Sequence, residues 1–165
     1  METIKDEIGT AAQRLGLLES EIRLLPEEAG RRVFDAAVEH FVVGGDRVWW
    51  WEAFRLPATW RKFDDGRAFE RIVAVAPDPD ERVWFVAEES HLPFYPVYET
   101  TPRTAESVIG ACYGFEYYLI AKDFSWLICE THHNDLVAIG EPAEERLRQL
   151  STEPWHATRG APPGG

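Results

Sequence analysis

The segment from Phe115 to Gly140 constrains the fold of this chain more than any other part of the sequence. It contains two apolar runs, FEYYLIA and WLICE, joined by the turn-prone sequence KDFS, an arrangement typical of a β-hairpin. If the first and last residues of KDFS pair, the alternation of strands places Leu119 opposite Ile128 and Tyr117 opposite Glu130. Large apolar side chains then lie on both sides of the hairpin. This pattern predicts a central position in a sheet that is covered on both faces.

Three further runs of aromatic and β-branched residues predict strands: RVWWWEAF (47–54), ERIVAVA (70–76) and RVWFVAEE (82–89). The turn-rich sequences DDG and PDPDE separate them. The run HLPFYPVYE (91–99) contains two prolines, which have no N–H to donate to a ladder. We therefore expect it to form at most an edge strand or an extended crossing.

The N-terminal part of the chain has a helical pattern. Apolar residues recur every three or four positions from residue 3 to residue 25, which predicts one long amphipathic helix. Pro26 interrupts this pattern, and residues 26–43 predict a second helix followed by two glycines. Together these segments predict an N-terminal helical hairpin. Residues 101–114 and 141–150 predict two shorter helices, the first capped by Thr101 or Thr104.

The predicted fold class is α+β. The helical hairpin is expected to pack on a mostly antiparallel central sheet of about five to seven strands, with the two short helices added. A chain of 165 residues, of which 45% are hydrophobic, is the size of one domain with one core. We assign this domain to residues 1–151 and expect the Pro- and Gly-rich residues 152–165 to form a flexible tail.

The charge of the chain limits its partners. Lys and Arg number 17 against 29 Asp and Glu, a net charge of −12 that repels nucleic acid and anionic membranes. The same field attracts a basic protein partner. The sequence has no apolar run long enough to span a bilayer and begins without a secretory signal pattern, so we expect a cytoplasmic protein with its two cysteines reduced.

The densest polar cluster is CETHHND, residues 129–135. Glu130, His132, His133 and Asp135 are residue types that hold zinc or carry acid–base chemistry. Adjacent histidines on a strand point to opposite faces, however, and cannot share one ion unless the backbone turns between them. The main expectation is therefore structural: His132 pairs with Glu130, and His133 pairs with Glu116. A ligand-binding role and a metal site are the alternatives.

Other residues are candidates for binding. Glu52 and Glu116 lie within aromatic runs, where burial raises the pKa of a carboxyl unless a basic group pairs with it. Pairing with a neighbouring arginine is the simpler expectation for Glu52. Aromatic side chains anchor many interfaces, and the candidates are Trp50, Trp60, Phe94, Tyr95 and Tyr98. For Trp50 and Trp60, packing in the core against the helical hairpin is the main expectation, and a partly exposed anchor is the alternative.

The sequence lacks the motifs of several enzyme classes. It contains no GxSxG, no phosphate-binding loop, no GxGxxG and no HExxH. We therefore assign no catalytic residue, no metal and no cofactor.

The run EYY, followed by WL-x-CE-x-HH and a closing glycine, resembles the C-terminal signature of an uncharacterised bacterial domain family. The resemblance extends more loosely to WWWE and WFVAEE, over residues 45–141, and implies no particular activity. Small, acidic, tryptophan-rich chains of this kind also resemble bacterial immunity proteins, which block a toxin.

These observations lead to one main hypothesis, a non-enzymatic binding module of immunity or antitoxin type with a basic partner. The first alternative is a small-molecule or metal-dependent enzyme that uses the Glu130–Asp135 cluster. The second is a structural or regulatory homo-oligomer with Trp50 or Trp60 buried between subunits. The sequence gives no indication of the oligomeric state.

Overall fold

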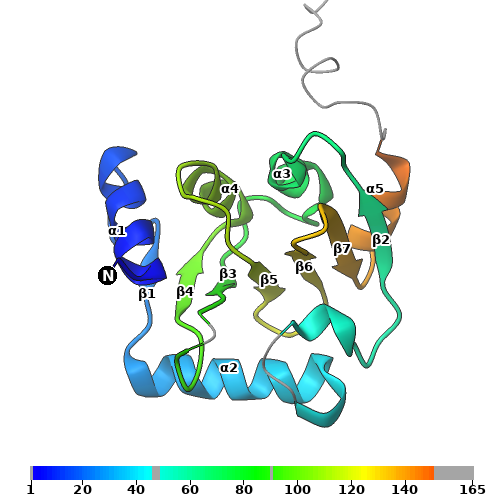
Figure 1. Cartoon of the computed structure of the whole chain (residues 1–165), viewed down its shortest axis with the longest axis horizontal. Helices are drawn as coiled ribbons and strands as arrows, with labels where there is room; N and C mark the ends of the chain where they lie inside the picture. The colour runs from blue at the N-terminus through cyan, green and yellow to red at the C-terminus, as the bar shows by residue number, and fades with distance from the viewer. Residues whose placement is uncertain (1, 46–48, 90, 151–165) are drawn as a thin grey trace, which may run out of the picture.

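The computed structural model describes residues 2–45, 49–89 and 91–150. Within these residues the chain folds into five α-helices and one seven-stranded antiparallel sheet (Figure 1). The predicted α+β class is therefore confirmed. The strand order across the sheet is β1-β4-β3-β5-β6-β7-β2. The strands are β1 (Arg23–Leu24), β2 (Thr59–Lys62), β3 (Val83–Ala87), β4 (Val97–Thr100), β5 (Tyr117–Ala121), β6 (Leu127–Glu130) and β7 (Asp135–Ile139).

The predicted hairpin forms the centre of the sheet as β5 and β6. Tyr117 pairs with Glu130 and Leu119 pairs with Ile128, so the predicted register is confirmed. Every residue of β5 is buried. Apolar side chains on both faces of this ribbon require cover from both sides, and the structure provides it.

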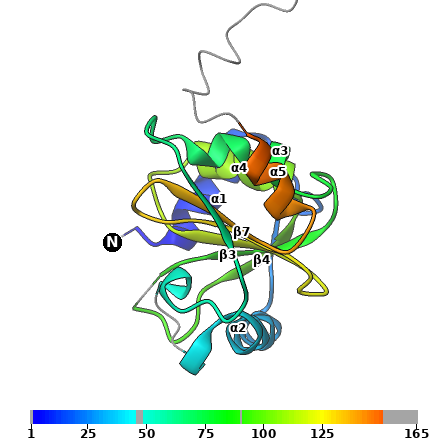
Figure 2. The same ribbon diagram turned by 90° about the vertical axis from the view of Figure 1, so that its right-hand side faces the viewer.

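The helices supply this cover in two layers. They are α1 (Ile4–Arg14), α2 (Glu27–Phe41), α3 (Ile72–Val75), α4 (Pro102–Gly110) and α5 (Ala143–Gln149), with 3₁₀ turns at Val43–Gly45, Trp50–Glu52 and Ala68–Arg71. Helix α2 covers one face of the sheet, and the other four helices cover the opposite face (Figure 2). The two predicted short helices are confirmed as α4 and α5, and the Thr101 side chain accepts a hydrogen bond from the Thr104 N–H as the cap of α4.

The predicted N-terminal helical hairpin is wrong. Helix α1 ends at Arg14 because Leu15 caps it and Gly16 follows with a φ of +69°, the left-handed conformation that ends many helices. The chain then runs along the sheet edge as β1 before α2 begins. Helices α1 and α2 consequently pack on opposite faces of the sheet and not against each other (Figure 2).

Two predicted strands are helical instead. Residues 70–76 form the end of a 3₁₀ turn and then α3, which buries Ile72 and Val75. Residues 50–52 form a 3₁₀ turn, while residues 46–48 lie outside the described part of the chain. The predicted strand at residues 82–89 is confirmed as β3. The predicted tail, residues 152–165, also lies outside the described residues.

The proline-containing run at residues 91–99 was expected to reach at most the edge of the sheet. Its strand, β4, starts only after the second proline and pairs with β3 on one side and with the short β1 on the other. The edge position is taken by β1, which the sequence pattern did not reveal.

Candidate functional site

A 3₁₀ turn places two tryptophans at the surface by burying the one between them. The Trp50 ring stacks on Tyr118 with a centroid distance of 4.2 Å and an interplanar angle of 20°. Its backbone N–H donates to the Tyr118 hydroxyl at 3.1 Å. Trp50 is fully buried, so core packing, the main expectation for this ring, is confirmed, and the alternative of a partly exposed anchor is wrong for Trp50. Its neighbour Trp49 is exposed, and Trp51 is half-buried at the margin of the core.

The β6–β7 turn brings the two histidines together. The Asn134 N–H donates to the Thr131 carbonyl at 3.2 Å, and Asn134 has a φ of 66° that closes the turn. Because the backbone turns here, His132 and His133 are not on opposite faces of a strand. Their ring centroids are 4.1 Å apart, and both rings are exposed.

These residues form one aromatic surface with Trp51 at its centre. The centroid of Trp51 lies 5.3 Å from that of His132, 5.8 Å from that of His133 and 6.3 Å from that of Trp60 on β2. Trp49 lies 5.5 Å from His132. Trp49 and Trp60 are 43% and 42% exposed, so Trp60 follows the alternative of a partly exposed ring and not the expected core packing. We call Trp49, Trp51, Trp60, His132 and His133 the Trp–His surface.

A pair of carboxyl groups lies beneath this surface. The β3–β5 ladder continues one residue past Ala87, and the Glu88 N–H donates to the Glu116 carbonyl at 2.9 Å. The two side chains then lie opposite each other on the α2 face and share a hydrogen bond. Burial, followed by the bond to Glu116 and its charge, raises the pKa of Glu88 to about 8. The pair therefore holds one proton at neutral pH.

Glu116 connects the carboxyl pair to the Trp–His surface. Its Oε1 atom lies 2.7 Å from His132 Nδ1 and accepts the His132 backbone N–H at 3.1 Å. Its Oε2 atom accepts the Trp51 indole N–H at 3.4 Å. Among the described residues, no lysine or arginine forms an ion pair with Glu88 or Glu116. The rings thus cover a carboxyl pair that, among the described residues, forms a side-chain ion-pair contact only with the His132 imidazole.

The expected pairing of the histidines is wrong in its partners. His132 contacts Glu116 and not Glu130, while the His133 backbone N–H donates to the Thr131 hydroxyl at 3.2 Å. Glu130 lies on the opposite face of the sheet, where its Oε1 atom accepts the Tyr117 hydroxyl at 2.9 Å. Burial raises the pKa of Glu130 to about 7, although the bond from Tyr117 lowers it.

The predicted cluster Glu130–Asp135 therefore does not converge on one point. Asp135 accepts a hydrogen bond from the Thr131 hydroxyl at 3.3 Å, at the start of β7. Within residues 2–45, 49–89 and 91–150, no group of three or more His, Cys, Asp or Glu side chains is arranged to hold a metal ion. In the same residues, no helix combines the length and the apolar character needed to cross a membrane.

The remaining candidates have separate locations. Glu52 is exposed on its 3₁₀ turn and is not embedded in an aromatic strand. Tyr95 and Tyr98 are 0% and 5% exposed, so neither is a surface anchor. The Tyr95 hydroxyl is close enough to Glu88 to lower the pKa of its carboxyl. Phe94 is half-buried beside α2.

Sequence reasoning did not select Trp49, Trp51 or Glu88. The WWW run could have indicated the two tryptophans, because in consecutive residues the side chain of the middle one points in a different direction from those of its two neighbours. Glu88 gave no comparable signal, since its partner Glu116 lies 28 positions later and meets it only through the pairing of β3 with β5.

Comparison with known proteins gives one match. A family model described as "Family of unknown function (DUF6756)" matches residues 1–151. No curated protein and no solved structure matches the chain.

Proposed function

We propose that this chain, which belongs to the DUF6756 family, is a protein-binding module whose Trp–His surface binds a basic partner protein. The family has no known function to transfer, so the proposal rests on the molecule itself. An inhibitor of immunity or antitoxin type, acting in the cytoplasm on a basic partner, is the specific form that we propose.

One observation carries the proposal: exposed tryptophans gather over a carboxyl pair that no lysine or arginine of the described chain neutralises. Tryptophan and arginine are over-represented in binding hot spots, because large flat side chains exclude water and bury much area. A cationic side chain over an indole face gains cation–π attraction, which the buried negative charge of Glu116 strengthens.

The overall charge supports the same partner. At −12 the chain steers a basic protein toward itself and repels acidic ones. A catalytic role for the carboxyl pair has less support, because Glu88 and Glu116 interact with each other and neither residue lines one of the cavities of the described chain.

The test compares the chain with a double variant, Trp49→Ala/Trp60→Ala. Both side chains are more than two-fifths exposed, so their removal should leave the fold intact. Tyr113→Ala is the matched control, since Tyr113 is 82% exposed but belongs to the α4–β5 connection. Each immobilised protein is incubated with lysate of the source cells at low salt, and captured proteins are quantified by mass spectrometry.

We expect the wild type and Tyr113→Ala to enrich the same basic protein and the double variant to lose it. With that protein purified, the double variant should bind at least about tenfold more weakly, and binding should weaken as salt rises. Equal capture by all three proteins would contradict the proposal. A homo-oligomer that Trp60→Ala dissociates, seen by light scattering, would instead support a self-association surface.

A further inference from the structure

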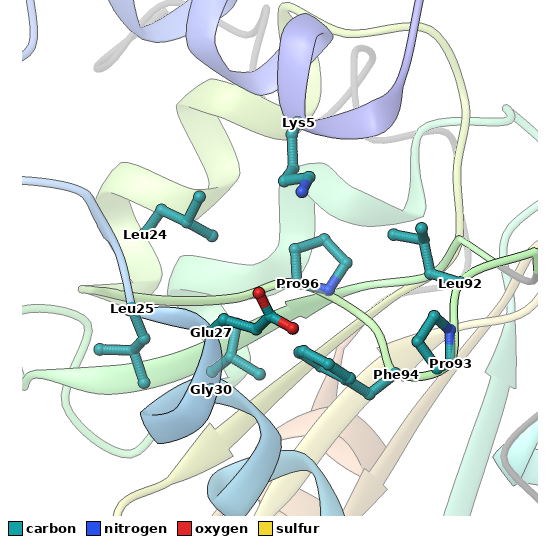
Figure 3. Close-up of a pocket in the computed structure, with 10 residues that line it drawn as sticks. Lys5, Leu24, Leu25, Glu27, Gly30, Leu92, Pro93, Phe94 and Pro96 are labelled. Carbon is teal, nitrogen blue, oxygen red and sulfur yellow. The ribbon is translucent and has the colours of Figure 1, made fainter.

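A cavity of about 300 Å³ lies at the N-terminal end of α2, near the edge of the sheet formed by β1 and β4. It is bounded by the starts of α1 and α2 and by the loop before β4 (Figure 3). Its volume is at the lower limit of small-molecule sites, which suits a ligand of few atoms. Its apolar surface comes mainly from Leu24, Leu25, Leu92, Pro93, Phe94 and Val97.

Two charged side chains of opposite sign reach into this apolar space. Lys5 descends from α1 on one side, and the Glu27 carboxylate enters from the first turn of α2 on the other (Figure 3). Among the ion pairs of the described residues, none joins Lys5 to Glu27. Both charges are therefore available to a ligand that carries a carboxylate and an ammonium group.

A glycine leaves part of the cavity open. Gly30 lines it from within α2, although glycine in a helix interior is less favourable than alanine. A methyl group there would meet the Cβ atoms of Leu25 and Val97 at 3.7 and 3.8 Å, which are ordinary contacts. Packing does not exclude alanine, and the absent side chain adds its volume to the cavity.

We infer that this cavity binds a free α-amino acid with a large apolar side chain. The Lys5 ammonium pairs with the ligand carboxylate, the Glu27 carboxylate pairs with its ammonium group, and the side chain packs on Phe94 and the leucines. A peptide residue lacks one or both of these charges, because its amino and carboxyl groups are in amide bonds. The site is separate from the Trp–His surface and does not depend on the function proposed for it.

The binding test uses the intact chain with L-leucine and L-phenylalanine as probes, followed by ligand-observed NMR and calorimetry. We expect both to bind saturably. Phenylpropionate lacks the amine and phenethylamine lacks the carboxylate, so each should bind at least about tenfold more weakly. L-Serine, which lacks the apolar side chain, should not bind.

Variants locate the site. Lys5→Ala and Glu27→Gln should each weaken L-phenylalanine binding about tenfold or more, while Glu28→Gln, one residue along the same exposed helix turn, should not change it. Gly30→Leu should abolish binding by filling the cavity, and circular dichroism should show that its fold is retained.

Three results would overturn the inference. One is a failure of both amino acids to saturate the wild type at millimolar concentration. The other is binding that Lys5→Ala, Glu27→Gln and Gly30→Leu all leave unchanged. The third is binding of phenylpropionate or phenethylamine as tight as that of L-phenylalanine. Each analogue lacks one of the two charges, so such binding would show that the site does not recognise both the carboxylate and the ammonium group.

Discussion

On the α2 face of the sheet, Glu99 lies at one end of the β3–β5 ribbon and the Glu88–Glu116 pair lies at the other. Glu99 forms ion pairs with Arg23 at 3.2 Å, with Arg82 at 3.3 Å and with Lys122. The bond from Lys122, followed by those from the two arginines, lowers the pKa of Glu99 to about 2.

The other end has the opposite environment. Glu88 is half-buried beside another carboxyl, and its pKa is raised to about 8. The same sheet face thus carries two kinds of carboxyl site. Glu99 forms ion pairs with three basic side chains, whereas the Glu88–Glu116 pair contacts only the imidazole of His132 among the basic side chains of the described residues. Neutralised charges serve the fold, whereas charge left without a cation beneath exposed rings is available to a partner. The predictions below test this contrast.

The largest expected effect on stability comes from Trp50, the buried ring beneath the Trp–His surface. Trp50→Ala removes a fully buried ring that stacks on Tyr118, so we expect a loss of about 3–5 kcal/mol in the free energy of unfolding. Trp60→Ala should cost less than about 0.5 kcal/mol, because this ring is 42% exposed. Urea unfolding measures both. Similar losses for the two variants would mean that Trp60 is part of the core and not of a recognition surface.

The neutralised end should lose stability when its charge is removed. Glu99→Gln breaks three ion pairs at a side chain that is 15% exposed, and we expect a loss of about 2 kcal/mol at pH 7. In the wild type this stabilisation is present above the ordinary pKa of 4.5 and is lost as the pH falls through about 2. Glu28→Gln, an exposed control whose pair with Arg32 spans 3.8 Å, should change stability by less than about 0.5 kcal/mol.

The carboxyl pair should respond in the opposite direction. The raised pKa of Glu88 means that the folded state holds a proton that the unfolded chain releases above pH 4.5. Its contribution to stability is therefore full below pH 4.5 and falls until about pH 8. Glu88→Gln should be more stable than the wild type at pH 8, by about 1 kcal/mol after solvent screening is considered, and similar to it at pH 4.

Unfolding at both pH values checks this difference. In Glu88→Gln, the fall in the free energy of unfolding between pH 4 and pH 8 should be smaller than in the wild type. Some of it should remain, since Glu130 on the other face also has a raised pKa, of about 7. A Glu88→Gln variant that is less stable than the wild type at pH 8 would show that the ionised pair stabilises the fold.

The sequence predicted the parts of the fold that local periodicity determines. The β5–β6 register followed from alternation around a short turn, and α2 followed from its apolar stripe. Helix α1 was predicted too long because the stripe continued through Leu18, a residue that is 67% exposed. Gly16 was the available stop signal. In the run at residues 70–76, the spacing of Ile72, Val75 and Ala76 was already helical, but the β-branched composition outweighed it.

The candidate site depends on contacts that periodicity does not contain. His132 and His133 meet because Asn134 adopts a left-handed conformation, and Glu88 meets Glu116 through strands distant in sequence. The Trp49–Glu52 turn has the composition of a strand, yet the buried stack of Trp50 on Tyr118 determines its conformation. The types of residue in the site were visible in the sequence, but their partners were not.

The most direct test of the contrast between the two ends follows tryptophan indole N–H signals by NMR while an arginine-rich peptide is added. Trp49 and Trp60 report on the carboxyl-pair end, and Trp84, whose ring lies 4.8 Å from the Lys122 ammonium, reports on the Glu99 end. Tryptophan-to-phenylalanine variants assign the signals. We predict saturable shifts for Trp49 and Trp60 and no shift for Trp84. Comparable shifts at Trp84, or none at Trp49 and Trp60, would contradict the account.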